Sequence, residues 1–447
     1  MEKLNIVIPE YARKALALLE KAGYEAWCVG GCVRDALRGA EPHDWDICTS
    51  AMPDEMMEVF SRFRTIPTGL KHGTLTVLIG GEQVEITTYR CDGDYTDHRR
   101  PDSVRFVRDI RSDLERRDFT MNAMCLDLRG NILDLFGGRE DMERGIIRCV
   151  GEPEKRFGED ALRIFRAVRF AAKTGFAIEE HTAAAALAMR GDLANVSEER
   201  LYSELKTLLV QPFAGKVLRE YKEIIGEVVP EAVPCFGFRQ NNPHHCFDVW
   251  EHITHAVENI PADETLRLTM LFHDIAKPAM FTEDANGISH FKGHPLESSK
   301  AADTILRRLK ADNRTRERVC ALIAEHDNRL PPLRKAVRRF LSKYDREFFG
   351  EWLEVRRADT LAQSDYFRKE KLEELDELEK LCDTILDEEP CLKLDRLAVR
   401  GGDMSALGLK GRGSGDMLEE LLLLVVDERV PNDKQALLEA AERIMHR

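Results

Sequence analysis

The chain has 447 residues, of which 43% are hydrophobic and 33% are charged. This balance is typical of a folded protein with several cores, and it excludes disorder as the main state. The 66 Lys and Arg against 80 Asp and Glu give a net charge of −14 and a pI near 5.5. Taken alone, this acidity disfavours a nucleic-acid binder, because polyphosphate binding needs a positive surface.

The first few residues carry both acid and base and lead into no apolar segment, so we expect no signal peptide. The apolar runs are too short to span a membrane, and the longest candidate is residues 421–426. The 11 Cys are scattered without a CxxC pair, which favours reduced thiols over a zinc site or a disulfide framework. We therefore expect a cytoplasmic protein.

Residues 1–137 mix helical and strand patterns, whereas helical periodicity dominates from about residue 138 onward. The fold class predicted is an α+β head with a small sheet and helices, followed by all-α domains. The expected helix of the head covers residues 8–22, and its expected strands cover residues 25–29, 75–79, 84–89 and 123–127. The later expected helices cover residues 160–173, 198–210, 249–259, 266–274, 298–309 and the acidic segment 369–389.

A first group of candidate catalytic residues follows a Gly-Gly turn. Gly30 and Gly31 stand between a predicted strand and a predicted helix, where the backbone can approach a bulky anion, although such turns are often purely structural. Asp44 and Asp46 follow; alternation along a strand would put both carboxylates on one face. Glu85 lies between apolar residues of another strand, where an unpartnered carboxylate would be costly to bury.

Three carboxylates on adjacent strands beside a Gly-Gly turn are chemically suited to hold two Mg²⁺ ions for nucleotidyl transfer. One ion would activate an attacking hydroxyl, and the other would neutralise the triphosphate. The pattern of Gly-Gly, Asp-x-Asp and a third acid resembles the DNA polymerase β nucleotidyltransferase superfamily.

Three longer segments resemble motifs of the class II tRNA nucleotidyltransferases, the CCA-adding enzymes and their bacterial poly(A) polymerase relatives. These segments are GGCVRDALRGAEPHDWDICT at 30–49, RRDFTMNA at 116–123 and RFGEDALRIFRAVRFAAKTGF at 156–176. The resemblance implies a polymerase β-like head that binds tRNA, CTP and ATP. It assigns nucleotide binding to Gly31, Arg34, Arg117, Asp118, Glu159, Asp160, Arg163, Arg166 and Arg169.

In this family a Glu-Asp-x-x-Arg helix takes the place of a nucleic-acid template. Asp160 and Arg163 have i,i+3 spacing, which would put them on one helix face. A carboxylate only accepts hydrogen bonds and a guanidinium only donates, so the pair matches the pairing edges of C and A and leaves unpaired groups against G and U. By resemblance, Glu159 orients Arg163.

The alternative reading of this helix is a surface ion pair. Against it, Arg163, Arg166 and Arg169 follow at three-residue spacing, and three guanidiniums on one face would repel one another without an anion. The segment 90–108 occupies the position of the family's flexible loop, which assists the switch from C to A addition; a solvated loop without a catalytic part fits its sequence equally well.

A second group of candidate residues contains most of the 13 His, between residues 244 and 326. Imidazole and carboxylate groups suit divalent metals. The order His, His-Asp, Asp resembles the HD phosphohydrolase superfamily, which implies a divalent metal on His252, His273, Asp274 and Asp359. His294 and His326 would complete a second metal position.

With these resemblances, the predicted domains are a catalytic nucleotidyltransferase head (1–137), a helical neck for base and RNA binding (138–230), an HD metal-binding domain (231–365) and a helical tail (366–447). The function expected is template-independent addition of CCA to the 3′ end of tRNA. The alternatives are a poly(A) polymerase, an enzyme that adds only CC or only A, and, from another class, an HD-domain nucleotide phosphohydrolase.

The negative total also conceals segregated charge. Residues 299–343 carry 13 Lys and Arg against 5 acids, whereas residues 370–389 carry 10 acids against 2 bases. We therefore expect basic stretches that follow an RNA backbone, with the acidic helix turned away from it.

Overall fold

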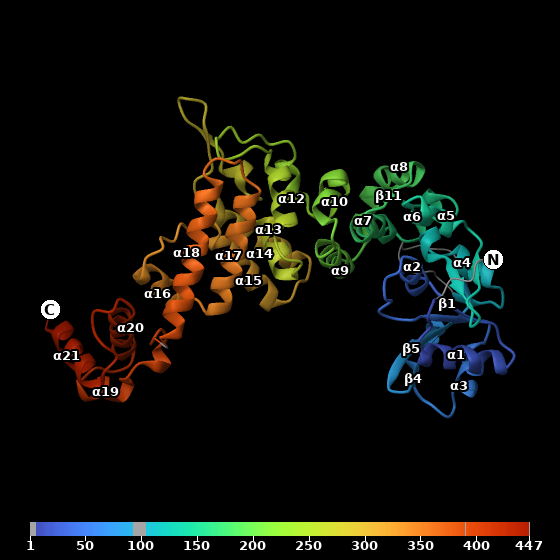
Figure 1. Cartoon of the computed structure of the whole chain (residues 1–447), viewed down its shortest axis with the longest axis horizontal. Helices are drawn as coiled ribbons and strands as arrows, with labels where there is room; N and C mark the ends of the chain where they lie inside the picture. The colour runs from blue at the N-terminus through green and yellow to red at the C-terminus, as the bar shows by residue number, and fades with distance from the viewer. Residues whose placement is uncertain (1–5, 93–103, 389, 447) are drawn as a thin grey trace. The chain divides into compact units, whose positions relative to one another are not determined.

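In the computed structural model (Figure 1), which describes residues 6–92, 104–388 and 390–446, the chain divides into two compact units, Met1–Pro230 and Glu231–Arg447. Each unit has its own buried residues and is considered by itself. The middle of the expected flexible loop, residues 93–103, lies outside the described residues. The two ends of that loop pair as a short antiparallel hairpin, β6 (Arg90–Asp92) with β7 (Val104–Phe106).

The first unit is built on a seven-stranded sheet with the order β3-β4-β5-β2-β1-β8-β9. Its strands are β1 (Ala26–Val29), β2 (Ile47–Thr49), β3 (Arg64–Ile66), β4 (Thr74–Ile79), β5 (Glu82–Thr88), β8 (Met124–Leu126) and β9 (Ile132–Asp134). Because β2 runs antiparallel to β1 and parallel to β5, the end of β1 and the start of β2 share one edge of the sheet. This edge carries the candidate catalytic residues.

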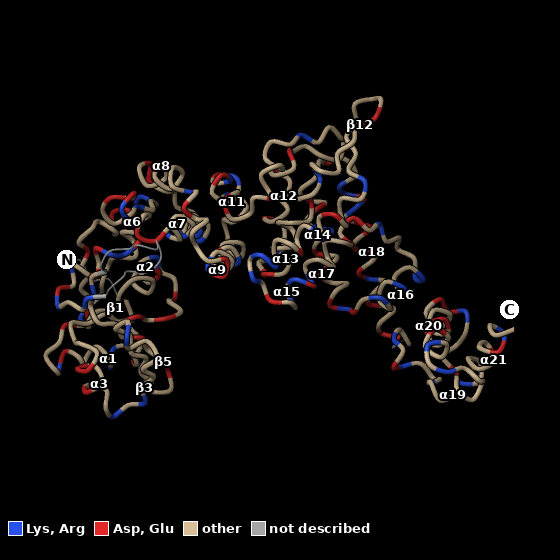
Figure 2. Tube along the Cα trace, turned by 180° about the vertical axis from the view of Figure 1, so that it is seen from behind, with Lys and Arg blue, Asp and Glu red and all other residues tan. Residues whose placement is uncertain are grey.

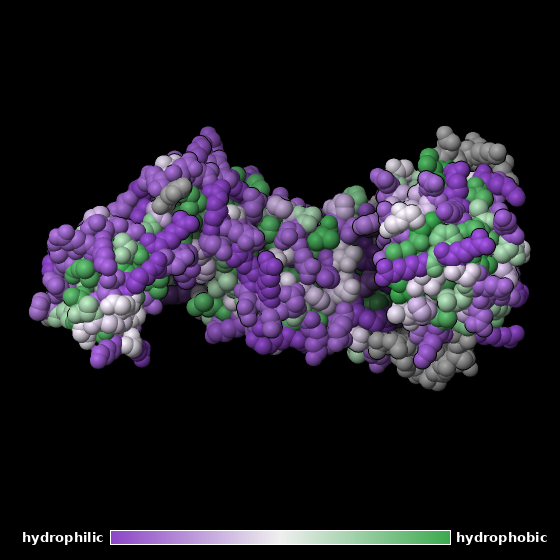
Figure 3. All heavy atoms as spheres, turned by 90° about the horizontal axis from the view of Figure 1, so that it is seen from below, coloured by the Kyte–Doolittle hydropathy of each residue, from purple (hydrophilic) through white to green (hydrophobic). Residues whose placement is uncertain are grey.

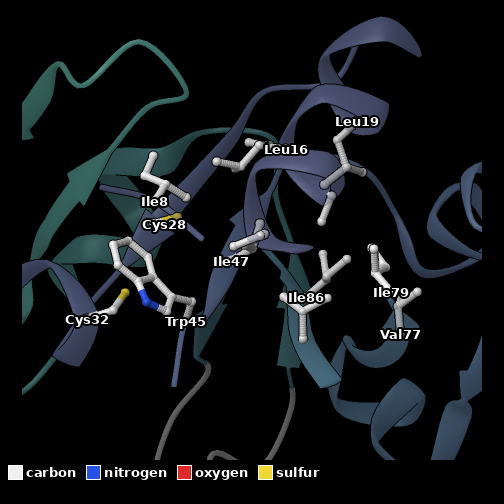
Figure 4. Packing of buried hydrophobic residues seen from close by; sticks show 14 of the residues in the cluster. Ile8, Leu16, Leu19, Cys28, Cys32, Trp45, Ile47, Val77, Ile79 and Ile86 are labelled. Carbon is white, nitrogen blue, oxygen red and sulfur yellow. The ribbon is translucent and has the colours of Figure 1, made fainter. Parts of the chain in front are cut away.

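One face of this sheet is covered by α1 (Glu10–Lys21), whose apolar residues recur at helical spacing. Figure 4 shows Leu16 and Leu19 of this helix packed toward Ile47 and Ile86 of the strands, and all four side chains are buried. The other helices around the sheet are α2 (Gly31–Leu37), α3 (Pro53–Val59), α4 (Ile110–Glu115) and α5 (Gly138–Glu143).

The rest of the first unit is mainly helical. Its helices are α6 (Pro153–Glu159), α7 (Leu162–Thr174), α8 (Glu180–Ala188), α9 (Glu198–Leu209), α10 (Ala214–Glu220) and α11 (Lys222–Val228). The central helix α7 packs against α9 and α10. Its buried side includes Ile164, Phe165 and Val168, as their spacing predicts.

The second unit is a helical assembly. Its helices are α12 (Val249–Asn259), α13 (Glu264–Phe272), α14 (His294–Arg308), α15 (Asn313–Glu325), α16 (Arg334–Lys343), α17 (Arg346–Leu361), α18 (Arg368–Asp387), α19 (Gly401–Ala406), α20 (Arg412–Val426) and α21 (Lys434–Met445). Helices α12, α13, α15 and α17 pack on one another, and α14 packs on α13 and α15. Helices α19 to α21 share a smaller apolar cluster around Met404, Leu421 and Leu437.

The predicted fold class, an α+β head followed by mainly helical segments, is confirmed. The expectation that strands end near residue 138 is wrong in detail. Two short parallel strands pair in the first unit, β10 (Ile146–Ile147) with β11 (Ala177–Ile178), and a hairpin lies in the second, β12 (Thr282–Glu283) with β13 (Ser289–His290). Strands of two residues are too short to show a sequence period. The division into four domains stays a prediction.

Hydrophilic residues cover most of the face that Figure 3 shows. None of the described helices combines the length and the hydropathy that crossing a bilayer requires. The cysteines, most of them buried, are free thiols.

Candidate functional site

The Gly-Gly turn joins β1 to α2 at the catalytic edge of the sheet. Gly30 has φ 82° and ψ −125°, a backbone conformation that side chains disfavour. A Cβ at this position would also lie 3.1 Å from Nη1 of Arg117. Gly31 begins α2, and a Cβ there would meet only Nη2 of Arg34, at 3.7 Å. Position 30 therefore requires glycine, and its turn brings Arg117 against the backbone.

The candidate catalytic carboxylates lie at this same edge. Ile47 pairs with Ile86 across the parallel strands, and the backbone N–H of Val29 donates to the carbonyl of Asp46 at 3.0 Å. Asp46 and Glu85 are each one residue before that pair, so they lie side by side, with Asp46 opposite the last residue of β1. The topology thus gathers carboxylates from two segments next to the Gly-Gly turn.

Two details of the sequence prediction are wrong here. Asp44 and Asp46 precede β2 instead of lying within a strand, although the buried Trp45 between them leaves both carboxylates exposed. Glu85 lies in β5 but is exposed, so the argument from the cost of burial does not apply to it. Along each segment, side chains alternate between the core and the solvent. Val84 and Ile86 point into the core, so Glu85 between them points outward, as Asp44 and Asp46 do on either side of Trp45.

These acids act on one another electrostatically. Desolvation by surrounding protein atoms, and then the negative charges of Glu85 and Asp44, raise the pKa of Asp46, while Arg117 acts in the opposite direction. Among the ion pairs of the described residues, none involves these three carboxylates. Oxygen ligands without a protein cation suit a hard divalent ion such as Mg²⁺. The tight clusters of potential metal ligands in the described residues lie elsewhere.

A buried hydrogen-bond network extends from α2. The guanidinium of Arg34 donates to both carboxylate oxygens of Asp35 at 2.9 Å and to Oδ1 of Asn122 at 2.6 Å. Lys173 of α7 donates to Asp35 at 2.9 Å. Nδ2 of Asn122 donates to Asp118 at 3.0 Å. Arg34 is thus fixed by protein partners, and α2 is tied to α7 through charged side chains.

Asp118 is the next member of this network and is almost fully buried. It accepts hydrogen bonds from the guanidinium of Arg166 at 2.6 and 3.0 Å and from the N–H of Phe119 at 2.8 Å. Burial alone would raise its pKa, but Arg166 and Asn122 lower that pKa far below the usual range. Asp118 is therefore a carboxylate at neutral pH, and it holds α7 close to the catalytic edge.

The sequence predicts that the Glu-Asp-x-x-Arg segment lies on one continuous helix. In the structure this segment contains a helix break. Helix α6 ends at Glu159, Asp160 is extended with φ −145°, and α7 begins at Leu162. The Asp160 carboxylate accepts from Arg200 of α9 at 2.7 Å and from the N–H of Leu162 at 3.2 Å. Because of this break, Asp160 and Arg163 are not i,i+3 neighbours on one helix face. Asp160 still lies directly before α7.

Arg163 is held in one orientation. It donates to Glu159 at 2.7 Å and to the carbonyl oxygens of Arg116 and Arg156 at 2.7 and 3.1 Å. These bonds use three of the five N–H groups of a guanidinium. The structure thus brings Glu159 onto Arg163, while the part of both residues in reading a base stays a prediction.

The argument from repulsion among three arginines is also wrong. Each of Arg163, Arg166 and Arg169 has a protein carboxylate as partner, and the partner of Arg169 is Glu204 of α9. Sequence reasoning missed Glu204 and Arg200, because their partners, Arg169 on α7 and Asp160 just before it, are 35 and 40 residues away and no local spacing reveals them. Asn122 lies inside the RRDFTMNA motif but has no chemistry that singles it out.

The second group of candidate residues converges in the second unit. Nε2 of His252 on α12 lies 3.1 Å from Nε2 of His273, 3.1 Å from Asp274 and 3.1 Å from Asp359 on α17. His273 directly follows α13, and all four side chains are buried. Asp274 reaches a second pair through its other oxygen, which lies 3.1 Å from His294 and 3.6 Å from His326.

The protonation of these rings follows from their outer contacts. Nδ1 of His252, His273, His294 and His326 contacts a backbone carbonyl at 3.1, 2.8, 2.8 and 2.7 Å. A carbonyl only accepts, so Nδ1 carries a proton, and a neutral ring directs the lone pair of Nε2 into the cluster. Facing lone pairs and carboxylates at about 3 Å repel unless a proton or a metal cation lies between them. Burial alone would lower the pKa of His252, but its hydrogen bonds to Asp274 and Asp359 raise that pKa to about 9. The cluster therefore fits one or two divalent metal ions.

The comparisons with known proteins concern both units. Residues 26–148 match the family described as poly A polymerase head domain, and residues 175–224 match a probable RNA and SrmB-binding site of polymerase A. Residues 294–441 match a putative tRNA nucleotidyltransferase domain 2.

Among curated relatives, the CCA-adding enzyme of Geobacillus thermodenitrificans is 52% identical over 200 residues, 45% of this chain and 49% of that protein. The CCA-adding enzyme of Oceanobacillus iheyensis is 47% identical over 225 residues, 50% of this chain and 55% of that protein. The matched region thus spans about half the length of these curated relatives.

The Bacillus stearothermophilus CCA-adding enzyme, solved in complex with CTP, is similar over 98% of both chains with a TM-score of 0.74 and 30% identity. The Thermotoga maritima CCA-adding enzyme complexed with tRNA_CCA shares the fold, with a TM-score of 0.57 and 20% identity over 99% of this chain and 97% of that one. Together with the Gly-Gly turn, its carboxylates and the Glu-Asp-x-x-Arg segment, these matches show that the chain belongs to the class II family of CCA-adding enzymes and poly(A) polymerases.

Proposed function

We propose that this protein adds CCA to the 3′ end of tRNA from CTP and ATP without a nucleic-acid template. The observation that carries the proposal is the convergence of Asp44, Asp46 and Glu85 beside Gly30, in a fold similar over its whole length to a CCA-adding enzyme solved with CTP. The terminal hydroxyl of tRNA attacks the α-phosphate of the nucleotide, a new P–O bond forms, and pyrophosphate leaves.

The three acids are the residues that would hold Mg²⁺. Two such ions activate the attacking hydroxyl and neutralise the triphosphate when they are bound. Arg117 lies against the Gly30 backbone and is paired with Asp113 at 3.3 Å, so it is placed to meet phosphate oxygens. Arg34 and Asp118 act by fixing α2 and α7 relative to this edge, and Arg166 and Arg169 hold the same frame.

Base choice is assigned to Asp160 and Arg163. The carboxylate of Asp160 keeps acceptor capacity beside its bonds to Arg200 and Leu162, and Arg163 keeps two N–H groups. An acceptor and a donor so placed match the amino group and ring nitrogen of cytosine or adenine. Guanine or uracil would leave both protein groups unpaired, at roughly 1–3 kcal/mol per group.

The test uses tRNA transcripts that end before CCA or after CC, each incubated with one labelled nucleotide at a time. We expect C and A to be incorporated, with a stop after three residues. A long A tail would indicate a poly(A) polymerase, and a stop after C or C-C alone, or A addition alone, would indicate a specialised enzyme. The predicted cytoplasmic location is consistent with this substrate.

We also propose a second activity, metal-dependent hydrolysis of a phosphate ester in the second unit. The observation that favours it is the geometry of Asp274, which shares its two oxygens between His252 with His273 on one side and His294 with His326 on the other. A bridged pair of divalent ions is a known means of stabilising both the attacking and the leaving oxygen of a phosphate.

Metal analysis of the purified protein, followed by assays on nucleoside 2′,3′-cyclic phosphates, tests this second activity. We expect bound divalent metal and slow ester hydrolysis that a chelator removes. A protein that holds no metal after exposure to Mn²⁺ or Mg²⁺ and hydrolyses no ester would show that the cluster is structural.

A further inference from the structure

The buried His and Asp cluster opens into a cavity of about 540 Å³ in the second unit. This volume lies in the range of small-molecule sites. Five cationic side chains line the cavity: Lys277, Lys292, Arg329, Arg356 and Lys371. Lys277 is almost fully buried and contacts Asp274 at 2.7 Å and Gln240 at 2.9 Å. Asp274, Asp327, Asp359 and Glu374 also line the cavity, so the cations offset these acids and are the groups that would meet a phosphate.

Aromatic rings continue outward from one side of this cavity. His244 lines it, and the ring of Tyr366 lies 5.0 Å from the His244 ring at 62°. Phe367 follows, with its ring 4.5 Å from that of Tyr366. Tyr366 and Phe367 are 49% and 52% exposed. Adjacent large rings in solvent leave apolar faces that a flat partner would cover.

The segment that carries these rings is held rigidly. The N–H of Ser364 donates to the carbonyl of His244 at 2.9 Å, and its hydroxyl donates to the carbonyl of Pro243 at 2.6 Å. Phe367 has φ 55°, a left-handed conformation that is uncommon for a bulky residue and costs free energy. The backbone that carries the rings is therefore anchored by Ser364 and takes a left-handed turn at Phe367, directly before α18.

The same segment is connected to the metal-binding cluster. Gln363 donates to Asp359 at 3.0 Å and accepts from Lys371 at 2.7 Å. Helix α17, which ends at Leu361, and helix α18, which begins at Arg368, flank the segment (Figure 1). One short connection thus joins a predicted metal ligand, a cation of the cavity and the exposed rings.

We propose that Tyr366, with Phe367 and His244, forms a stacking platform for the base of a nucleoside phosphate whose phosphate enters the cavity. The inference rests on the proposed hydrolase activity and names its substrate class. Every base has a π-face, so the platform accepts all four bases, in contrast to the head. The ligand chemistry is the same whether the nucleotide is free or is the unpaired last residue of an RNA.

Equilibrium dialysis with labelled GMP tests the platform, because the head is expected to disfavour guanine. In the presence of Mn²⁺ we expect the wild type to bind GMP and Tyr366→Ala to bind it roughly tenfold more weakly, the equivalent of about 1.4 kcal/mol. Tyr366→Phe keeps the ring and should bind like the wild type. Leu423→Ala is the matched control, since Leu423 is 51% exposed on α20 and does not line the cavity.

Ribose 5-phosphate, which has no base, is the second probe. Tyr366→Ala should leave its binding unchanged, which also shows that the variant is folded. Equal loss of both ligands, or GMP binding that the alanine does not weaken, would overturn the platform, as would a wild type that binds no GMP. If GMP binding depends on Tyr366 but no ester is hydrolysed, the platform stands and the hydrolase proposal fails.

A short RNA that ends in a 3′-phosphate distinguishes the two sources of ligand. Binding at least roughly tenfold tighter than GMP, with the same dependence on Tyr366, identifies an RNA end as the occupant. Equal or weaker binding identifies a free mononucleotide.

Discussion

The two candidate sites of this chain are built in opposite ways. The carboxylates of the head are exposed at the end of a sheet and have no protein cation as partner in the described ion pairs, whereas the His and Asp cluster of the second unit is buried and its rings are fixed from outside by carbonyls. The first site is open to ions that arrive with a nucleotide. The second holds its rings and carboxylates in place beforehand, as a resident metal site would require.

A hydrogen-bond network next to the three candidate catalytic acids of the head connects α2 to α7. The chain of contacts from Lys173 through Asp35, Arg34 and Asn122 to Asp118 becomes buried toward Asp118, and all of its members except Asn122 are charged. Such networks fix geometry because any broken member leaves an unpaired buried group. In the head, the hydrogen-bonded network and the exposed carboxylates are thus separate, while in the second unit the fixed rings and the carboxylates belong to one cluster.

The largest expected effect comes from Asp46→Asn in the head. Removal of one of the three carboxylates should lower incorporation of labelled CTP into tRNA by at least about 10²–10³-fold, because a group that stabilises the transition state is lost. Asp54→Asn, an exposed acid on α3, is the control and should be as active as the wild type. Retention of more than a tenth of the activity in Asp46→Asn would show that the exposed acids are not the catalytic centre.

Asp274→Asn tests whether the second site is independent. The bridging carboxylate serves both halves of the cluster, so we expect Mn²⁺ affinity, measured by dialysis and metal analysis, to fall by more than about 100-fold. Incorporation of CTP should not change. The matched control is Asp395→Asn, an exposed acid outside the cavity. Equal loss of both activities would mean that the two sites do not function separately.

Asp160→Ala should alter base choice more than rate. Without this acceptor, the preference for CTP over UTP should fall by about 10–100-fold, measured as the ratio of kcat/KM values for a single addition. Glu199→Ala, an exposed acid on α9 next to Arg200, controls for lost charge in the same region. A variant with unchanged selectivity would assign the reading of the base to other residues.

A further effect is expected on stability, through the buried Asp118. Its pKa is lower in the folded protein than its unfolded value of about 3.9, so its stabilisation is present above that pH and is lost as the pH falls through the folded pKa. Asp118→Asn should lower the free energy of unfolding by roughly 2–3 kcal/mol near pH 7. The difference from the wild type should shrink below about pH 4 in urea titrations. A constant difference across this range would rule out the Arg166 pair as its cause.

The sequence predicted more of the second site than of the first. His252, His273, Asp274 and Asp359 come together, although the sequence analysis expected no helix where α17 carries Asp359 and placed His273 and Asp274 inside a helix that ends at Phe272. In the head, Asp44 and Asp46 lie before the strand and Asp160 lies at a helix break. Breaks and strand ends depend on tertiary contacts such as the bond from Arg200, which no local pattern contains.

The prediction that the acidic helix turns away from the basic stretch is wrong. The charged residues of α16 are all basic and most of those of α18 are acidic, and the two helices pack on each other, in the region that Figure 2 colours by charge. Arg334 of α16 pairs with Glu388 after α18, and Arg339 pairs with Asp427. The acidic helix therefore faces the basic stretch instead of turning away from it. Cations already paired with acids release few counterions, so RNA binding through this region should depend only weakly on salt.

The four carbonyls that fix the imidazoles belong to Met270, Phe291, Ile323 and Ala362. A backbone carbonyl is present whatever the side chain, so these contacts to the rings do not depend on the identities of the four residues, although Met270, Ile323 and Ala362 are themselves buried in the core. The orientation of the rings thus depends on where the backbone carbonyls lie and on the His and Asp residues themselves. It depends little on which side chains the neighbouring residues have. Relatives with an intact cluster are therefore best recognised by superposing helix ends, even where their sequences around the histidines share nothing.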